Sequence, residues 1–176
     1  MIDVHVLTYS GTRKDWLDQC LASLAREPLV TVHVLEGDEG NVGAGRVRGY
    51  RMGTHPYVSY VDSDDYILPG TIDACLEGLK HAPAVVTMER RLWGHLFDSS
   101  LRGGHHLTVY KRERVLPLLD LLPDHPLHCD ILLVKKLTPR QLPHVGYVWR
   151  MHGGQGHRKA TFEQRERMRK VAAWTR

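Results

Sequence analysis

Three carboxylates lie within four positions in the segment YVSYVDSDDYILPG, residues 57–70. Asp62, Asp64 and Asp65 follow a run of β-branched and aromatic residues that is typical of a buried strand. A proline-glycine pair then indicates a turn, and the apolar spacing in residues 71–80 predicts a helix. The acids are therefore expected at the C-terminal end of a strand, which is the edge where open α/β sheets bind ligands.

Clustered carboxylates at such an edge suit a hard divalent cation. Mg²⁺ and Mn²⁺ prefer oxygen ligands and are often shared between protein carboxylates and substrate phosphates. The alternative is a solvated acidic turn that caps the next helix, because Asp is common in turns and at helix N-termini. The cluster alone leaves both interpretations open.

The composition is that of an ordinary globular domain. The chain has 176 residues, of which 42% are hydrophobic and 25% charged, so we expect a single domain over residues 1–176. Its opening residues lack the features of a signal peptide, and no apolar run is long enough to span a membrane, which favours a cytoplasmic location without stable membrane insertion. The three cysteines are odd in number and widely spaced, which favours free thiols over disulfides.

Strand and helix patterns alternate along the chain. Strands are predicted near residues 2–8, 30–35, 57–62 and 84–88, with helical patterns between them, so the fold class is α/β with a mostly parallel sheet flanked by helices. The order is harder to read after residue 90. There the patterns indicate a strand and a helix in 105–122, a short helix at 130–137, a strand at 146–151 and an amphipathic helix at 161–174.

The order of these features resembles that of a small family 2 glycosyltransferase with the GT-A fold, possibly of phage type. The matching features are a first strand ending in LTYS, a second strand ending in Glu36, the segment NVGAGRVRG and the carboxylate cluster. The resemblance implies an abbreviated nucleotide-diphospho-sugar transferase fold, with a donor half at 1–90 and an acceptor half with a basic C-terminal helix at 91–176. Two departures are the short GDEG segment after Glu36 and Gly49, where an Asn often follows the Arg.

The resemblance implies a nucleotide-sugar donor, with UDP favoured, and a Mn²⁺ or Mg²⁺ ion. Asp62 and Asp64 would hold the ion, with Asp64 as the direct ligand and Asp62 reaching the ribose or a metal-bound water. His152, after the last predicted strand, would be the third contact to the metal or the diphosphate. Asp65 would orient the sugar or cap the following helix.

The resemblance also places residues around the rest of the donor. Thr8, Tyr9 and Glu36 would border the base and the ribose. Arg48, with Arg46 as the other candidate, would lie near the base or the diphosphate, where a guanidinium suits phosphate contact. The alternative is that these arginines form a solvated basic face.

An inverting transferase needs a general base that takes the proton of the acceptor hydroxyl. In the family this is usually an Asp ahead of a short apolar helix, and the segment LPDHPLHCDILLVKKL offers Asp130 and, in the preceding loop, Asp124. Asp130 is favoured, and either residue could instead be a helix cap. Zinc is a further alternative, but no pair among its candidate ligands has a recognisable zinc-site spacing with a matching second pair: His105, His106, His125, His128, Cys129 and His144.

Charge bears on the choice of partner. The formal net charge is +4, and residues 157–176 are rich in Arg and Lys. A sugar or glycan acceptor is favoured, while a hydroxymethylated base in DNA is an alternative in which the basic segment would follow the backbone. In that case the protein would be phage-encoded and act in the host cytoplasm. A non-catalytic module that binds nucleotide sugars or nucleic acid is the remaining alternative.

Overall fold

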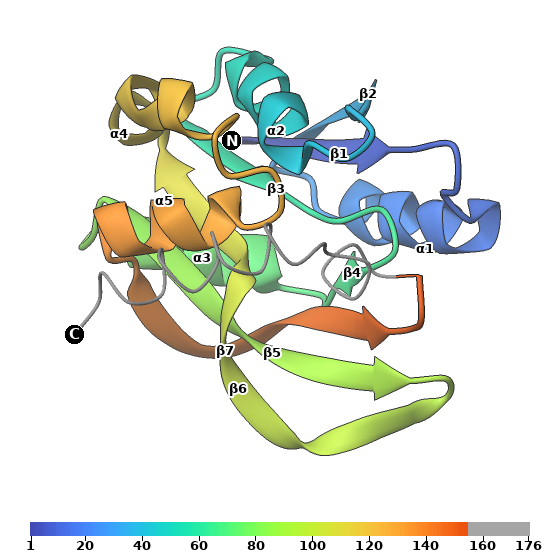
Figure 1. Cartoon of the computed structure of the whole chain (residues 1–176). Coiled ribbons are helices and arrows are strands. Elements are labelled where there is room, and N and C mark those ends of the chain that lie inside the picture. The colour runs from blue at the N-terminus through green and yellow to red at the C-terminus, as the bar shows by residue number, and fades with distance from the viewer. Residues whose placement is uncertain (155–176) are drawn as a thin grey trace.

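The computed structural model describes residues 1–154, in which helices cover both faces of one seven-stranded sheet (Figure 1). The strands are β1 (Ile2–Thr8), β2 (Val30–Glu36), β3 (Tyr57–Tyr60), β4 (Tyr66–Ile67), β5 (Ala84–Trp93), β6 (Leu96–Lys111) and β7 (Arg140–Met151). The helices are α1 (Lys14–Ala25), α2 (Val42–Arg51), α3 (Thr71–Leu79), α4 (Arg112–Val115), the 3₁₀ helix η1 (Leu116–Leu121) and α5 (Cys129–Leu137). The amphipathic helix predicted at 161–174 lies outside the described residues.

The sheet order is β2-β1-β3-β6-β5-β7-β4. β1 pairs in parallel with both β2 and β3, so the C-terminal ends of these three strands meet at one edge. The four predicted strands are confirmed as β1, β2, β3 and β5, although β3 ends at Tyr60 and β5 continues to Trp93. The predicted α/β fold class is therefore confirmed.

Pairing in the second half departs from the mostly parallel arrangement. β6 is antiparallel to both β3 and β5, because β5 and β6 form one long hairpin, and β4 is antiparallel to β7. Only β5 and β7 continue the parallel pattern on this side. The hairpin reaches away from the rest of the sheet (Figure 1).

Two hydrophobic clusters fix the helices to the two sides of the sheet. The first joins α1 and α3 to β1, and the second joins α2, η1 and α5 to β3 and β6. All three cysteines are buried and free, as predicted. Among the helices in residues 1–154, none is long and apolar enough to cross a membrane.

A buried carboxylate joins the first strand to distant segments. Asp3 is 3% exposed, and its Oδ2 accepts hydrogen bonds from Arg112 Nη2 at 2.6 Å and from the backbone N–H of His55 at 2.7 Å. Its Oδ1 lies 2.7 Å from His33 Nε2. Burial raises the pKa of Asp3, but the hydrogen bonds to His33 and the His55 N–H outweigh it, so the pKa lies below the ordinary 3.8.

Asp3→Asn should lower the free energy of unfolding by about 3 kcal/mol at pH 7, because Arg112 would keep a buried charge without its partner. A carboxyl with a lowered pKa in the folded state stabilises the protein above its ordinary pKa and loses this contribution as the pH falls. The difference between the variant and the unmutated protein should therefore shrink between about pH 5 and pH 3. Urea unfolding at several pH values measures this, with the exposed Asp73→Asn as control. A constant difference would contradict the assignment.

Candidate active site

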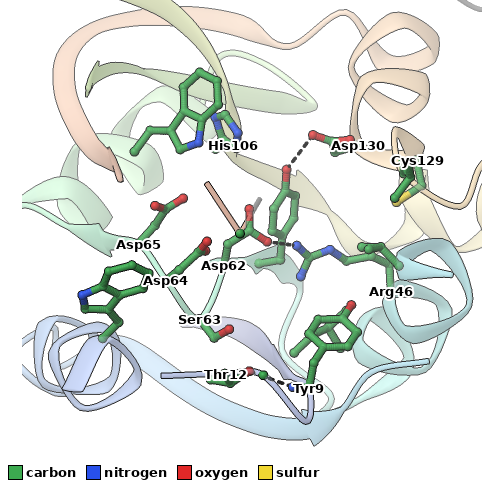
Figure 2. A pocket seen from close by; sticks show the side chains of 18 of the residues that line it. Tyr9, Thr12, Arg46, Asp62, Ser63, Asp64, Asp65, His106, Cys129 and Asp130 are labelled. Atoms are coloured by element: carbon green, nitrogen blue, oxygen red, sulfur yellow. Dashed lines mark hydrogen bonds and ion pairs between the residues drawn. The ribbon is translucent and has the colours of Figure 1, made fainter. Parts of the chain in front are cut away.

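One cavity of about 980 Å³ lies at the C-terminal edge of β1 and β3. Both halves of the chain contribute to its wall (Figure 2). From the first half come the loop after β1, α2 and the carboxylate segment, and from the second come β6, the N-terminal turn of α5, and the end of β7. A ligand in this cavity would therefore contact both predicted halves.

The three carboxylates of the cluster lie in the loop between β3 and β4, and each has a different partner. Asp62 Oδ1 forms an ion pair with Arg46 Nη2, and Asp64 Oδ2 lies 2.7 Å from His152 Nε2. Asp65 is almost fully buried. Separate partners reduce the repulsion that three adjacent charges would otherwise produce.

Asp65 connects the loop to β7. Its Oδ2 accepts a hydrogen bond from the Tyr147 hydroxyl at 2.8 Å, and its Oδ1 accepts one from the backbone N–H of Arg150 at 2.7 Å. Burial and the charges of Asp64 and Asp62 raise the pKa of Asp65 well above its ordinary value. Helix α3 begins after Gly70, so Asp65 does not cap it. Its contacts instead hold the carboxylate loop against β7.

Asp64 and His152 are the best candidates for metal ligands. Burial and the charge of Asp62 raise the pKa of Asp64, while the hydrogen bond with His152 opposes the rise. A bound cation would relieve this crowding of negative charge, and carboxylate oxygen with imidazole nitrogen is a donor set that Mn²⁺ accepts. The residues present therefore fit a divalent cation.

Arg46 and Arg48 occupy opposite environments. Arg46 is 3% exposed, lines the cavity, and holds its guanidinium 3.6 Å from the centre of the Tyr60 ring. Burial lowers its pKa, but the charge of Asp62 reverses this and leaves the pKa above its ordinary value. Arg48 is half-exposed, donates to Asp38 Oδ2 at 2.5 Å and to the Glu36 carbonyl at 2.6 Å, and is not among the residues that line the cavity.

The guanidinium of Arg46 has two N–H groups without a partner. Within the described part of the chain, its Nε and Nη1 have no hydrogen-bond partner and almost no accessible surface. Buried N–H groups without partners are rare and costly. Of the two arginine candidates, Arg46 is the one that lines the cavity.

Only one of the three residues predicted to border the nucleoside lines the cavity. Tyr9 lines the cavity, and its buried hydroxyl has no partner among residues 1–154. Gly37 makes room for it, since a Cβ there would lie 2.4 Å from the Tyr9 ring. Thr8 and Glu36 lie opposite each other at the ends of β1 and β2, outside the cavity lining.

Asp130 lies on the second side of the cavity, in the first turn of α5. The Tyr60 hydroxyl donates to its Oδ2 at 3.1 Å (Figure 2), and His105 Nε2 lies 3.3 Å from the same oxygen. Burial raises the pKa of Asp130, but the nearby histidines, His105 first, lower it below its ordinary value. The lowered pKa favours the ionised form of Asp130, whereas the other base candidate, Asp124, is exposed and outside the lining.

The sequence patterns did not identify Tyr60, His105 and His106 as residues of this cavity. The signal was present in consecutive histidines directly after two glycines, GGHH, since glycine in a strand often indicates a bulge. Glu89, His105 and His106 are also the only described set of three potential metal ligands whose atoms all lie within 4.8 Å of one another. His106 Nδ1 already lies 2.7 Å from Glu89 Oε2, however, so these groups satisfy each other without a metal.

Comparison with solved structures identifies the fold. The crystal structure of S. aureus TarS 1–349 in complex with UDP-GlcNAc superposes with a TM-score of 0.72 at 16% identity, covering 98% of this chain and 65% of that chain. The complex of TarS 1–349 with UDP gives a TM-score of 0.69 at 16% identity, covering 98% and 64%. A further TarS structure gives 0.66 at 15% identity, covering 98% and 39%.

The chain thus spans less than two thirds of the TarS chains that it matches. Identities of this size establish a shared fold, which is the GT-A glycosyltransferase fold. No curated protein sequence matches at a significant level. A family model described as Glycosyl transferase family 2 matches residues 10–137. Because this match covers well over half of the sequence, the chain belongs to glycosyl transferase family 2.

Proposed function

We propose that this protein transfers a sugar from a UDP-sugar to an acceptor hydroxyl with inversion at the anomeric carbon, assisted by Mn²⁺ or Mg²⁺. The observation that carries the proposal is that one cavity holds both the Asp64–His152 pair and Asp130. Family membership supports glycosyl transfer, and the match to TarS bound to UDP-GlcNAc and UDP supports the choice of nucleotide.

The donor would occupy the side formed by the first half. Asp64 and His152 would hold the cation, which would neutralise the negative charge that develops on the leaving diphosphate. Asp62, oriented by Arg46, would accept a hydrogen bond from the ribose. Tyr9 would border the base, and the unpaired Arg46 N–H groups would donate to donor oxygens.

Asp130 would act on the acceptor. Its carboxylate takes the proton of the acceptor hydroxyl while the hydroxyl oxygen forms a bond to the anomeric carbon. The bond between that carbon and the diphosphate oxygen breaks at the same time, and UDP leaves with the electron pair. A single base on the acceptor side is consistent with direct displacement and inversion.

The proposed acceptor is the hydroxyl of a sugar or glycan. The DNA alternative depends on the basic segment at 157–176, which lies outside the described residues. The non-catalytic alternative is less well supported, because a binder has no need of a second carboxylate in the same cavity as the proposed metal pair. The tests below separate binding from turnover.

UDP should bind much more tightly with Mn²⁺ than without it, because the diphosphate would share the ion with Asp64 and His152. Asp64→Asn should reduce this metal-dependent gain roughly 100-fold, and His152→Ala by a smaller factor, since even supporting contacts around a metal contribute 10–100-fold. Calorimetry of UDP binding with and without Mn²⁺ measures both. Equal affinity with and without metal in the unmutated protein would contradict the proposed metal site.

Arg46→Met should weaken UDP binding roughly 10- to 100-fold, because charged hydrogen bonds to the donor contribute about 1.5–3 kcal/mol. The matched variant Arg48→Met should change the affinity less than about twofold, since Arg48 pairs with Asp38 outside the cavity. Calorimetry with Mn²⁺ compares the two, and thermal unfolding shows whether each variant remains folded. The reverse order of effects would assign the donor contact to Arg48.

Asp130→Asn should leave UDP affinity unchanged but slow UDP release from UDP-GlcNAc by roughly 100- to 10,000-fold, as expected for loss of a general base. With water as the acceptor, this assay needs no knowledge of the natural acceptor. Asp124→Asn is the matched control and should retain the unmutated rate. If the unmutated protein binds UDP but releases none from UDP-GlcNAc, the non-catalytic alternative is favoured.

A further inference from the structure

Strand β6 is irregular where it reaches the cavity. Its pairing with β5 changes from Met88 opposite Gly103 to Val86 opposite Thr108, so the segment 104–107 faces Thr87 alone. Consecutive side chains of a regular strand point to opposite faces of the sheet, and a bulge removes this constraint. The bulge therefore allows two adjacent side chains to reach one side.

Those two side chains are His105 and His106. Both line the cavity, and the centres of their rings lie 4.0 Å apart. Gly104 is required directly before them, because a Cβ at this position would lie 2.8 Å from the Thr87 carbonyl oxygen and 2.9 Å from Glu89 Oε2. Gly104 thus allows β6 to pack closely against β5 at the point where the bulge turns both imidazoles toward the cavity.

His106 is fixed by its surroundings. Its Nδ1 lies 2.7 Å from Glu89 Oε2, and its ring stacks on Tyr147 with a centroid distance of 5.3 Å and an interplanar angle of 7°. Burial lowers the pKa of His106, but Glu89 outweighs this and raises it to about 9. His106 is therefore held by Glu89 and Tyr147 beside His105.

His105 and Tyr60 converge on one atom. The Tyr60 hydroxyl donates to Asp130 Oδ2 at 3.1 Å, and His105 Nε2 lies 3.3 Å from the same oxygen. Tyr60 is itself fully buried beneath the guanidinium of Arg46. Tyr60 in the core and the partly exposed His105 thus both contact Oδ2, and neither contact involves Oδ1.

We propose that His105 is a positioning residue for Asp130. The Nε2–H of the imidazole donates to Oδ2 together with Tyr60 and keeps Oδ1 directed at the acceptor hydroxyl. The bulge of β6 and the His106–Glu89 pair hold the His105 ring in place. This role rests on the proposed function, in which Asp130 is the general base.

The charge environment of Asp130 sets the direction of the expected effect. A donor to the ionised carboxylate stabilises it, so removal of the His105 donor should raise the pKa of Asp130. The other titratable groups that interact with Asp130 belong to α2, β3, β6, α5 and the residue before α5, and the variant leaves all of them unaltered: Tyr50, Tyr60, His106, Tyr110, Cys129 and His128.

The first experiment measures the pKa of Asp130 without donor or metal. The protein is labelled with ¹³C at its aspartate carboxyl groups, and the Asp130 signal is assigned by its loss in Asp130→Asn. In His105→Ala the pKa should rise, whereas in His105→Gln, whose side-chain amide can still donate, it should stay near that of the unmutated protein. An unchanged pKa in His105→Ala would overturn the proposed contact, whatever the protein's activity.

The second experiment measures UDP release from UDP-GlcNAc with Mn²⁺ across pH. His105→Ala should slow release roughly 10- to 100-fold, as expected for a misplaced catalytic group, and should move the acidic limb of the rate profile to higher pH. UDP affinity should be unchanged, and His105→Gln should recover most of the rate. The exposed His81→Ala is the control.

The outcomes separate the two proposals. A raised pKa of Asp130 with an unchanged rate in His105→Ala would overturn the positioning role. Loss of UDP release in Asp130→Asn with no effect in His105→Ala would do the same while leaving the proposed function intact. Full activity in Asp130→Asn would instead contradict the proposed function. The pKa of Asp130 in His105→Ala would still show whether His105 contacts Asp130.

Discussion

The site depends on partners that offset the negative charge of three adjacent carboxylates. Asp62, Asp64 and Asp65 follow β3 within one short loop, and their mutual repulsion would open this loop if it were not opposed. The partners come from distant parts of the chain, with Arg46 on α2 and His152 after β7. The electrostatics of one loop thus require that both halves of the fold be assembled around it.

The same compensation connects the two sides of the cavity. Arg46 pairs with Asp62 and lies over the ring of Tyr60, and the hydroxyl of Tyr60 reaches Asp130. A buried guanidinium is expensive to desolvate, and here one carboxylate and one aromatic face offset this cost. Rigid contacts between buried groups therefore set the separation between the proposed metal carboxylates and the proposed base.

The helix that carries Arg46 shows why sequence patterns could not choose between two arginines. Residues two positions apart on a helix point in nearly opposite directions, so only one of Arg46 and Arg48 can face the sheet. Three of the five buried residues of α2 are glycines, Gly43, Gly45 and Gly49, and the other two are Arg46 and Tyr50. The apolar spacing in α2 therefore does not indicate clearly which face of the helix is buried. Gly49 is required because a Cβ would lie 2.3 Å from the ring of His5.

Local patterns predicted well the parts of the fold that local chemistry determines. β1, β2 and β3 are short apolar runs between turn signals, and the carboxylates after β3 were placed at the correct edge of the sheet. Pairing in the second half depends on contacts between segments far apart in sequence, and a period-two pattern does not reveal which neighbour a strand will take. The antiparallel hairpin of β5 and β6 and its bulge therefore required the structure.

The bulge also explains why the cavity residues on the acceptor side were harder to predict from the sequence. In a regular strand only one of His105 and His106 would face the cavity, and the other would be counted as part of the opposite surface. β7 is irregular at the same level, since its register with β5 shifts between Val86 and Met88. Thr87 thus lies between irregular segments on both neighbouring strands. Because irregular pairing frees side chains from strict alternation, this level of the sheet can direct adjacent polar side chains to one face. The pairing of β1 with β2 and β3, on the donor side, is regular.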